Sequence, residues 1–291
     1  MAVKGIDVSR YQGDIDFRKV KEDGYEFVII QAGFGRFISQ KDKYFEQNYR
    51  NAKSAGLKVG AYWYSYAVTA AQAKAEAEVF LEVIKGKSFE YPVCMDIENE
   101  SQRLLSDNEV GDIVNAFCSH MESTGYYAAI YSYANFLKSK IPAECRKKYD
   151  VWIASFDVSA PDYSGNYGMW QYSNSGRVNG IRVNCDLDYA YKDYPAIMTE
   201  KGLNGFGTER KRLDENGFRK GDRGNGVLSL KQLLTLARLR GEISQGIDNN
   251  GIFGDGTQKA VNALLKKWGY TQNGIAGENF IKRLGEELQK D

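Results

Sequence analysis

The chain has 291 residues, 43% of them hydrophobic and 13% aromatic, and its formal net charge is only +1. This length suits two domains, or one barrel with an appendage. No apolar stretch approaches the ~20 residues of a membrane-spanning helix, so we expect no stable membrane association. No block of Lys and Arg is interleaved with aromatic residues, so we expect no nucleic-acid partner. Residues 201–291 carry a small positive excess, which favours an anionic polymer or, more commonly, marks a solvated basic face.

The cysteine and histidine content argues against several classes of site. The cysteines form no C-x-x-C pair, and the single histidine, His120, lies inside a helical pattern. The chain therefore lacks the ligand set of a structural zinc site. We expect the four thiols to be reduced and mostly buried. Without a G-x-S-x-G turn, a Ser-His-Asp or Cys-His mechanism is disfavoured. We expect no metal and no organic cofactor. The four cysteines are Cys94, Cys118, Cys145 and Cys185.

The first two thirds of the chain alternate strand-like and helix-like segments. Thr69 and Gln72 precede an alanine-rich helix, and Ser106 and Glu109 form a capping box before a 3.6-residue apolar stripe. Eight strands with intervening helices predict an α/β fold, a β/α barrel of the TIM type. The last three strands are separated by short polar loops, so the barrel should be irregular there. The predicted strands are residues 3–8, 27–32, 57–66, 93–97, 127–133, 151–154, 169–172 and 185–191.

The last third of the chain has a different character. Residues 197–216 lack apolar periodicity and contain several glycines and a charge cluster at 209–212, which predicts a linker. Residues 217–291 show three short helical stripes separated by glycine-rich turns. The sequence therefore predicts a barrel over 1–196, a linker over 197–216 and a small three-helix domain over 217–291.

Two acidic residues, Asp96 and Glu98, close the apolar run at 91–95. Alternate residues of a strand face the same side, about 6.6 Å apart, so the two carboxyl groups should share one face. Two close carboxylates oppose each other's ionisation, and one of them tends to keep its proton near neutrality. An acid beside an anion is what cleavage of a glycosidic bond requires, although an acidic pair also occurs at solvated strand ends and metal sites.

In a β/α barrel the chemistry gathers at the carboxyl ends of the strands. Asp7 lies near the end of the first predicted strand, and Asp186 lies on the last. Aromatic and amide side chains end several other strands, and flat rings beside carboxylates suit a sugar. Packing is the more common role for any one aromatic residue alone, and it is their convergence on one rim that favours a binding site. These candidate substrate-binding residues are Tyr62, Tyr64, Tyr131, Trp152, Trp170 and Gln171.

These segments together resemble family 25 of the glycoside hydrolases, the N-acetylmuramidase type of lysozyme. The matching motifs are GIDVS with YQG at 5–13, residues 27–35, GAYWY at 60–64, MDIE at 95–98, WQY at 170–172, and Gly180-Ile181 leading to Asp186. The resemblance implies an irregular barrel that hydrolyses the β-1,4 bond between N-acetylmuramic acid and N-acetylglucosamine. A related glycosidase acting on another N-acetylated polymer, such as chitin, is the alternative within enzymes.

The resemblance also implies roles for the acidic residues. Glu98 is expected to be the general acid, and Asp96 to stay charged and stabilise positive charge near the anomeric carbon. Asp7 and Asp186 are expected to line the same pocket. Asp188 matches a variable position of the family and is not included. The expected distance between the Asp96 and Glu98 carboxyl groups is near the range of inverting glycosidases. We nevertheless favour a retaining mechanism in which the substrate's acetamido oxygen assists.

Residues 217–291 resemble a three-helix peptidoglycan-binding domain, through KGDRG at 220–224, GIFG at 251–254 and NGIAG at 273–277. A muramidase with such a module and no visible signal peptide resembles a phage endolysin. We therefore expect synthesis in the host cytoplasm, release through a holin and bacterial peptidoglycan as partner. A bacterial autolysin of the same chemistry and a non-catalytic wall-binding protein are the alternatives. The sequence leaves the oligomeric state open.

Overall fold

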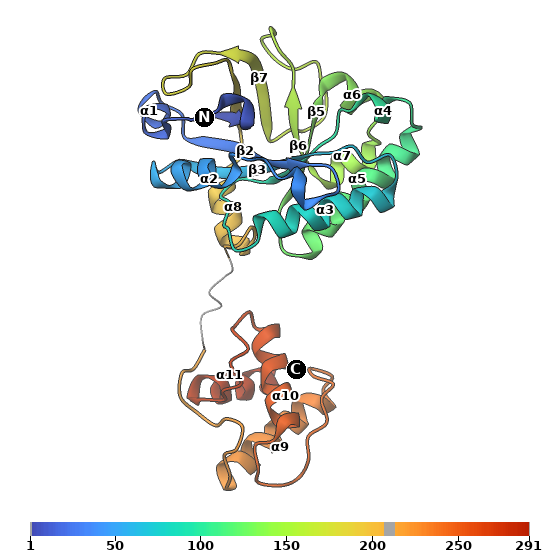
Figure 1. The fold of residues 1–291 in the computed structure, drawn as a ribbon. Helices are drawn as coiled ribbons and strands as arrows, with labels where there is room; N and C mark the ends of the chain where they lie inside the picture. Colours follow the sequence, from blue (N-terminus) through green and yellow to red (C-terminus); the bar gives the residue numbers. More distant parts are fainter. Residues whose placement is uncertain (1, 207–212, 291) are drawn as a thin grey trace. The chain divides into compact units, whose positions relative to one another are not determined.

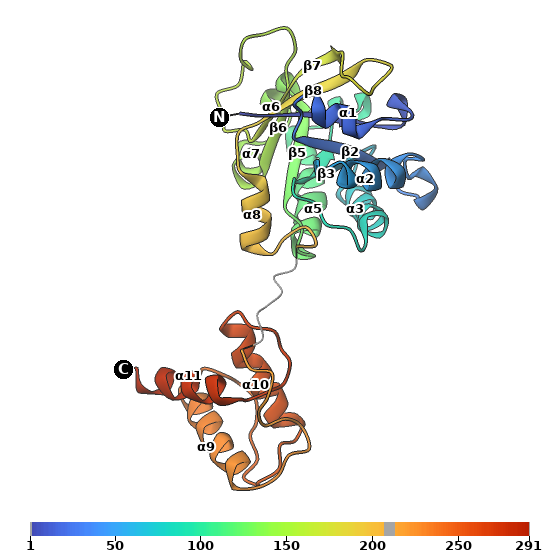
Figure 2. The same cartoon turned by 90° about the vertical axis from the view of Figure 1, so that its left-hand side faces the viewer.

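The computed structural model describes residues 2–206 and 213–290, and the chain divides into two compact units, residues 1–207 and 208–291. The first unit is a closed eight-stranded barrel (Figures 1 and 2). Neighbouring strands from β1 to β7 run parallel, whereas β8 is antiparallel to both β7 and β1. The predicted irregular barrel is therefore confirmed. The strands are β1 (Val3–Val8), β2 (Phe27–Phe34), β3 (Lys58–Tyr64), β4 (Val93–Asp96), β5 (Ala128–Tyr133), β6 (Asp150–Ala154), β7 (Met169–Gly176) and β8 (Cys185–Ala190).

The helices of the first unit follow the earlier strands and are absent between the last three. Both predicted helix starts are present, since Thr69 caps α3 by accepting from the Gln72 amide and Ser106 forms a capping box with Glu109. No helix separates β6 from β7 or β7 from β8, and the β7–β8 hairpin projects from the barrel (Figure 1). The helical segments are η1 (Arg10–Gln12), α1 (Phe17–Glu22), η2 (Ile38–Gln40), α2 (Phe45–Ser54), α3 (Ala70–Ile84), α4 (Glu100–Arg103), α5 (Asp107–Ser123), α6 (Ala134–Ser139), α7 (Ala143–Lys148) and α8 (Tyr194–Lys201).

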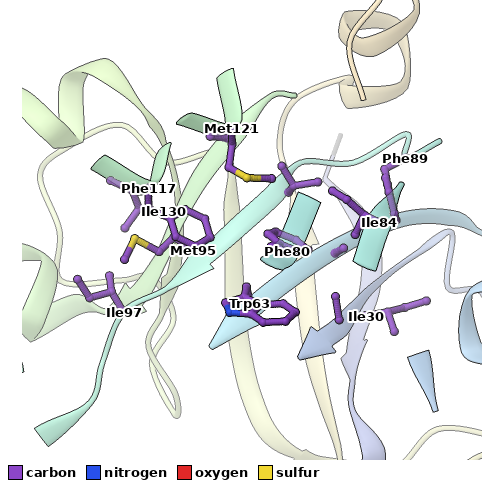
Figure 3. Close-up of a cluster of buried hydrophobic side chains, with 14 of the residues drawn as sticks. Ile30, Trp63, Phe80, Ile84, Phe89, Met95, Ile97, Phe117, Met121 and Ile130 are labelled. Atoms are coloured by element: carbon purple, nitrogen blue, oxygen red, sulfur yellow. The ribbon is translucent and has the colours of Figure 1, made fainter. Parts of the chain in front are cut away.

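The main core lies between the barrel and its helices (Figure 3). Trp63 stacks on Phe80 of α3 with 5.4 Å between ring centroids, and its indole N–H donates to the Gly35 carbonyl at 2.9 Å. Truncating a buried aromatic of this kind to Ala typically costs about 3–5 kcal/mol. Because side chains alternate along a strand, anchoring Trp63 toward the helices turns Tyr62 and Tyr64 toward the barrel interior.

The segment that follows β8 belongs to the barrel, which corrects the predicted linker at 197–216. Helix α8 covers 194–201, and Asn204 is fully buried. The Asn204 side chain accepts from the Tyr127 amide at 2.7 Å and donates to the Tyr91 carbonyl at 2.8 Å. Helix α8 has no amphipathic period, so the local sequence could not predict this packing, which depends on tertiary contacts. The predicted charge cluster at 209–212 lies outside the described residues.

The second unit contains three helices, as the apolar stripes predicted: α9 (Asn225–Leu239), α10 (Asp255–Lys267) and α11 (Glu278–Gln289). Asp214, in the predicted linker, belongs to this unit, because its carboxylate accepts from the Phe280 amide at 2.8 Å and caps α11. The buried Lys231 ammonium donates to the Asn250 and Ile252 carbonyls at 2.9 and 2.8 Å and also pairs with Asp248. In the described parts of the chain, no helix is long and apolar enough to cross a membrane.

Candidate active site

The predicted acidic residues meet at one end of the barrel, in a cavity of about 250 Å³. Asp7 and Asp96 lie near the carboxyl ends of β1 and β4, and Glu98 follows two residues after Asp96. Asp186 reaches the same rim from the amino end of β8, because β8 runs antiparallel and pairs Asp186 directly with Asp7. A larger hollow of about 800 Å³ beside α1 and α2 contains none of the predicted site residues. The four carboxyl groups therefore define the candidate active site.

Asp96 and Glu98 form an electrostatically coupled pair. Burial raises the pKa of Asp96 well above its usual range, and Glu98 raises it further. Burial also raises the pKa of Glu98, to about 7, against an opposing effect of Arg103. Within the described residues, Asp96 Oδ1 and Glu98 Oε2 have no hydrogen-bond partner. The pair therefore holds at least one proton near neutrality.

This charge distribution differs from the prediction that Asp96 stays ionised beside a protonated Glu98. Asp96 is the more buried of the two, and no described donor contacts its Oδ1 to stabilise the anion. Without substrate, burial thus disfavours ionisation of both carboxyl groups. Glu98 is the less buried partner, so it is the one that a substrate oxygen can reach.

A second acidic cluster lies on β1 and β8. The Gln171 amide donates to Asp7 Oδ2 at 2.7 Å, and burial together with Asp188 and Asp186 raises the pKa of Asp7. Burial raises the pKa of Asp186 to about 6 and that of Asp188 to about 8. The Trp152 indole N–H donates to Asp188 Oδ1 at 2.8 Å. Asp188 raises the pKa of Asp7, and Asp188 Oδ2 has no hydrogen-bond partner among the described residues, so ionisation of both acids together is disfavoured.

Aromatic rings wall the cavity. Tyr131 packs on Trp152 with 4.4 Å between centroids, and Tyr62 meets the same indole edge-on at 6.1 Å. The Tyr131 hydroxyl donates to Gln171 Oε1 at 2.8 Å, which orients the amide toward Asp7. Tyr64, also in the lining, is in hydrogen-bond contact with Asn99, the residue after Glu98. A proton donor, several carboxyl groups and flat apolar faces within one cavity suit cleavage of a glycosidic bond.

Comparison with known proteins agrees with this chemistry. The model of the family described as glycosyl hydrolases family 25 matches residues 6–181. The chain belongs to this family. It is 30% identical over 293 residues to the autolytic lysozyme of Clostridium acetobutylicum, an alignment that covers 97% of this chain and 81% of the relative. This family 25 chain is a glycoside hydrolase, a lysozyme.

Solved structures show the same architecture. The crystal structure of the bacterial lysozyme from Streptomyces coelicolor superposes with a TM-score of 0.60 at 28% identity, covering 69% of this chain and 99% of that one. The CTP1L endolysin gives a TM-score of 0.61 at 23% identity and covers 99% of each chain. The second likeness is one of fold.

Nine of the ten predicted site residues line the cavity of this lysozyme, and Trp170 does not. Its indole N–H donates to the Ser155 carbonyl at 2.8 Å, and its ring packs beside Tyr172 and Tyr189. Adjacent residues of a strand point to opposite faces. Because Gln171 points into the barrel, Trp170 has to point outward, and predicting both as binding residues ignored this alternation.

The same alternation places Asp188 on the face of Asp186, and only its variable position in the family excluded it from the predicted site. It lies two residues after Asp186 on one strand face and is buried beneath the cavity, where it contacts Trp152. Further lining residues that were not predicted as site residues come from loops and strand ends around the same rim: Ser9, Tyr11, Gln12, Gln31, Tyr133, Phe156 and Asn174. Ser9 directly follows a predicted strand, and Gln31 and Tyr133 lie at the carboxyl ends of two others, which was the available signal. Among the described residues, no group of three or more His, Cys, Asp and Glu side chains is arranged to hold a metal.

Proposed function

We propose that this lysozyme cleaves the β-1,4 bond between N-acetylmuramic acid and N-acetylglucosamine in bacterial peptidoglycan. The observation that carries the proposal is the coupled Asp96–Glu98 pair, which retains a proton at neutral pH inside an aromatic-walled cavity. Its relationship to an autolytic lysozyme over nearly the whole chain supports the same substrate. Reducing-end analysis of digested peptidoglycan tests it. Muramic acid ends are expected, and glucosamine ends would indicate a different bond specificity.

In the proposed mechanism Glu98 donates its proton to the glycosidic oxygen as the bond to the anomeric carbon breaks. The acetamido oxygen of the muramic sugar forms a new bond to that carbon. Asp96, which is ionised when the pair holds a single proton on Glu98, stabilises the positive charge that develops. The Glu98 carboxylate then removes a proton from water, which attacks the anomeric carbon and opens the cyclic intermediate. This route retains the β configuration, so proton NMR should detect the β-anomer first. An α-anomer first would establish inversion.

The Glu98 assignment is tested by an isosteric substitution. Glu98→Gln removes the transferable proton while keeping the shape, and we expect loss of wall hydrolysis with wall binding retained. Glu82→Gln, at an exposed position of α3, is the matched control and should remain active. Near-normal lysis by Glu98→Gln would remove Glu98 from the mechanism.

We also propose that the second unit binds the cell wall. Its three helices form a separate unit with its own core. The alignment with the autolytic lysozyme of Clostridium acetobutylicum covers 97% of this chain and therefore includes this unit. Truncation should begin after residue 207, because α8 and Asn204 belong to the barrel. The truncated chain should bind intact walls more weakly and hydrolyse soluble fragments as before. Loss of both activities would instead indicate a structural role.

For the biological role, we propose a phage endolysin that is made in the host cytoplasm and reaches the wall after a holin opens the membrane. An autolytic lysozyme aligns with 97% of this chain and the structure of an endolysin covers 99% of it, so a bacterial autolysin is the competing role. Expression in a susceptible host distinguishes them. Lysis only when a holin is co-expressed supports the endolysin, and lysis by the chain alone supports the autolysin. A turbidity assay on isolated walls excludes a non-catalytic binding protein if the walls clear.

A further inference from the structure

The rim of the active site carries exposed aromatic side chains from the segments after β1, β2 and β3. Tyr11 is 73% exposed, Phe37 62% and Tyr66 48%. The Tyr66 ring meets the Phe34 ring edge-on with 6.1 Å between centroids. Its centroid is 5.0 Å from that of Tyr64, which lines the cavity. Tyr11 lines the cavity as well. The rim is therefore continuous with the catalytic cavity, and large exposed apolar side chains gathered next to a site indicate a binding surface.

Arg10 lies within this aromatic surface. Its guanidinium carbon is 5.2 Å from the centroid of the Tyr11 ring and 5.2 Å from that of Phe34. One guanidinium nitrogen donates to the Tyr11 hydroxyl at 3.4 Å. Among the described residues it has no acidic partner at ion-pair distance: the nearby Asp42 carboxylate accepts instead from the Arg10 and Tyr44 backbone amides. The planar cation is held in place with donors still free.

The backbone that carries Arg10 is fixed before any ligand binds. Ser9 and Gln12 form a capping box around η1, and the Gln12 side chain donates to the Asn184 carbonyl at 3.2 Å. The Arg10 amide donates to Asp42 Oδ2 at 2.9 Å. A preorganised cation loses little conformational entropy when it binds a carboxylate, and the guanidinium fork matches both carboxylate oxygens.

Charge decides which part of a substrate this surface suits. The cavity contains four carboxyl groups, and in the described part of the chain no lysine or arginine lines it. Arg103, which acts electrostatically on Glu98, is already paired with Glu100. The cavity therefore offers an anionic group of the substrate no cation, whereas the rim offers the Arg10 guanidinium, which pairs with no acidic side chain at ion-pair distance among the described residues.

We infer that Arg10, with Tyr11 and Tyr66, binds the acidic peptide that peptidoglycan carries on the lactyl group of muramic acid. The inference rests on the proposed function, because a muramic sugar in the cavity must send its peptide out across the rim. The guanidinium pairs with a peptide carboxylate, and the two rings cover the apolar parts of the peptide. Arg10 thus makes the enzyme prefer peptide-bearing glycan to bare glycan.

The test compares Arg10→Gln with the wild-type full chain on two substrates: soluble peptide-bearing glycan fragments, and the same fragments after an amidase has removed the peptides. We expect KM for the peptide-bearing fragments to rise about tenfold, as loss of one charge-assisted contact implies, with kcat unchanged. Kinetics on the bare fragments should not change, and Arg10→Lys should recover part of the affinity. Arg18→Gln, which removes the same charge from the exposed face of α1, is the control and should match wild type.

Three outcomes overturn the inference, and they are distinguishable. An equal loss on both substrates would mean that Arg10 only supports Tyr11. No change on either substrate would mean that the peptide binds elsewhere. If the wild-type enzyme cleaves neither substrate, the proposed function itself fails. Thermal unfolding of Arg10→Gln should match wild type, which separates lost binding from lost folding.

Discussion

Replacing Glu98 by Gln should stabilise the barrel at alkaline pH while it removes activity. In the folded chain burial raises the pKa of Glu98 from its ordinary value of 4.5 to about 7. The native state therefore holds a proton that the unfolded chain has already released between these two pH values. The free energy of unfolding falls as pH rises through this window, because the unfolded state binds fewer protons. Gln cannot ionise, so the variant escapes this loss.

The size of the effect follows from the shift. Because proton binding is linked to folding, the raised pKa lowers the wild type's free energy of unfolding by about 1 kcal/mol at pH 5 and about 3 kcal/mol at pH 8. Any constant cost of burying an amide cancels when the two pH values are compared. The gain in stability of Glu98→Gln should therefore be about 2 kcal/mol larger at pH 8 than at pH 5.

Urea denaturation followed by tryptophan fluorescence measures this difference. Three of the four tryptophans, Trp63, Trp152 and Trp170, lie in the barrel unit, so the signal reports mainly on that unit. Glu82→Gln is the control, because this residue is exposed on α3, and it should change stability equally at both pH values. If Glu98→Gln changes stability by the same amount at pH 5 and pH 8, Glu98 does not carry the raised pKa and the proposed acid is wrong.

Three further predictions concern pH, the buried acids and the second unit. Hydrolysis of soluble peptidoglycan should fall as pH rises through about 7, because Glu98 with its raised pKa loses the proton that it must donate; activity that stays flat to pH 9 would contradict this. Trp152→Phe removes the indole donor to Asp188 and should cost about 1–3 kcal/mol in denaturation, whereas Trp268→Phe in the other unit should leave barrel stability unchanged. Lys231→Met leaves the loop carbonyls at 250 and 252 without their donor. We therefore expect wall binding to weaken while hydrolysis of soluble fragments continues. Loss of that hydrolysis would mean that the two units do not act separately.

The sequence was a good guide wherever local physics decides the structure. Every predicted strand is present, because each is a short apolar run bounded by turn residues, and β1 matches at both ends. The Ser106 capping box places the start of α5, since capping depends on residues four positions apart at most. The carboxyl ends of the strands identified Asp7 and Asp96, because parallel strands with helical crossovers all end at one rim.

The predictions that failed depended on contacts between distant residues. Residues 197–206 have no periodicity, yet Asn204 satisfies backbone groups more than seventy residues away in sequence. The raised pKa values of Asp96 and Glu98 reflect burial, and burial depends on what the rest of the chain places over each carboxyl group. The aromatic surface around Arg10 combines segments after three strands, and no spacing in the sequence connects them.

The sequence by itself determined which residues could be catalytic: strand alternation put Asp96 and Glu98 on one face, and the apolar runs specified a barrel with chemistry at its rim. The tertiary structure decided how they are used. Because β8 runs antiparallel, Asp186 reaches the rim from the start of its strand and pairs with Asp7; a parallel β8 would have placed it at the opposite end. Charge state and strand direction are properties of the assembled barrel, because both depend on neighbours that only folding brings together.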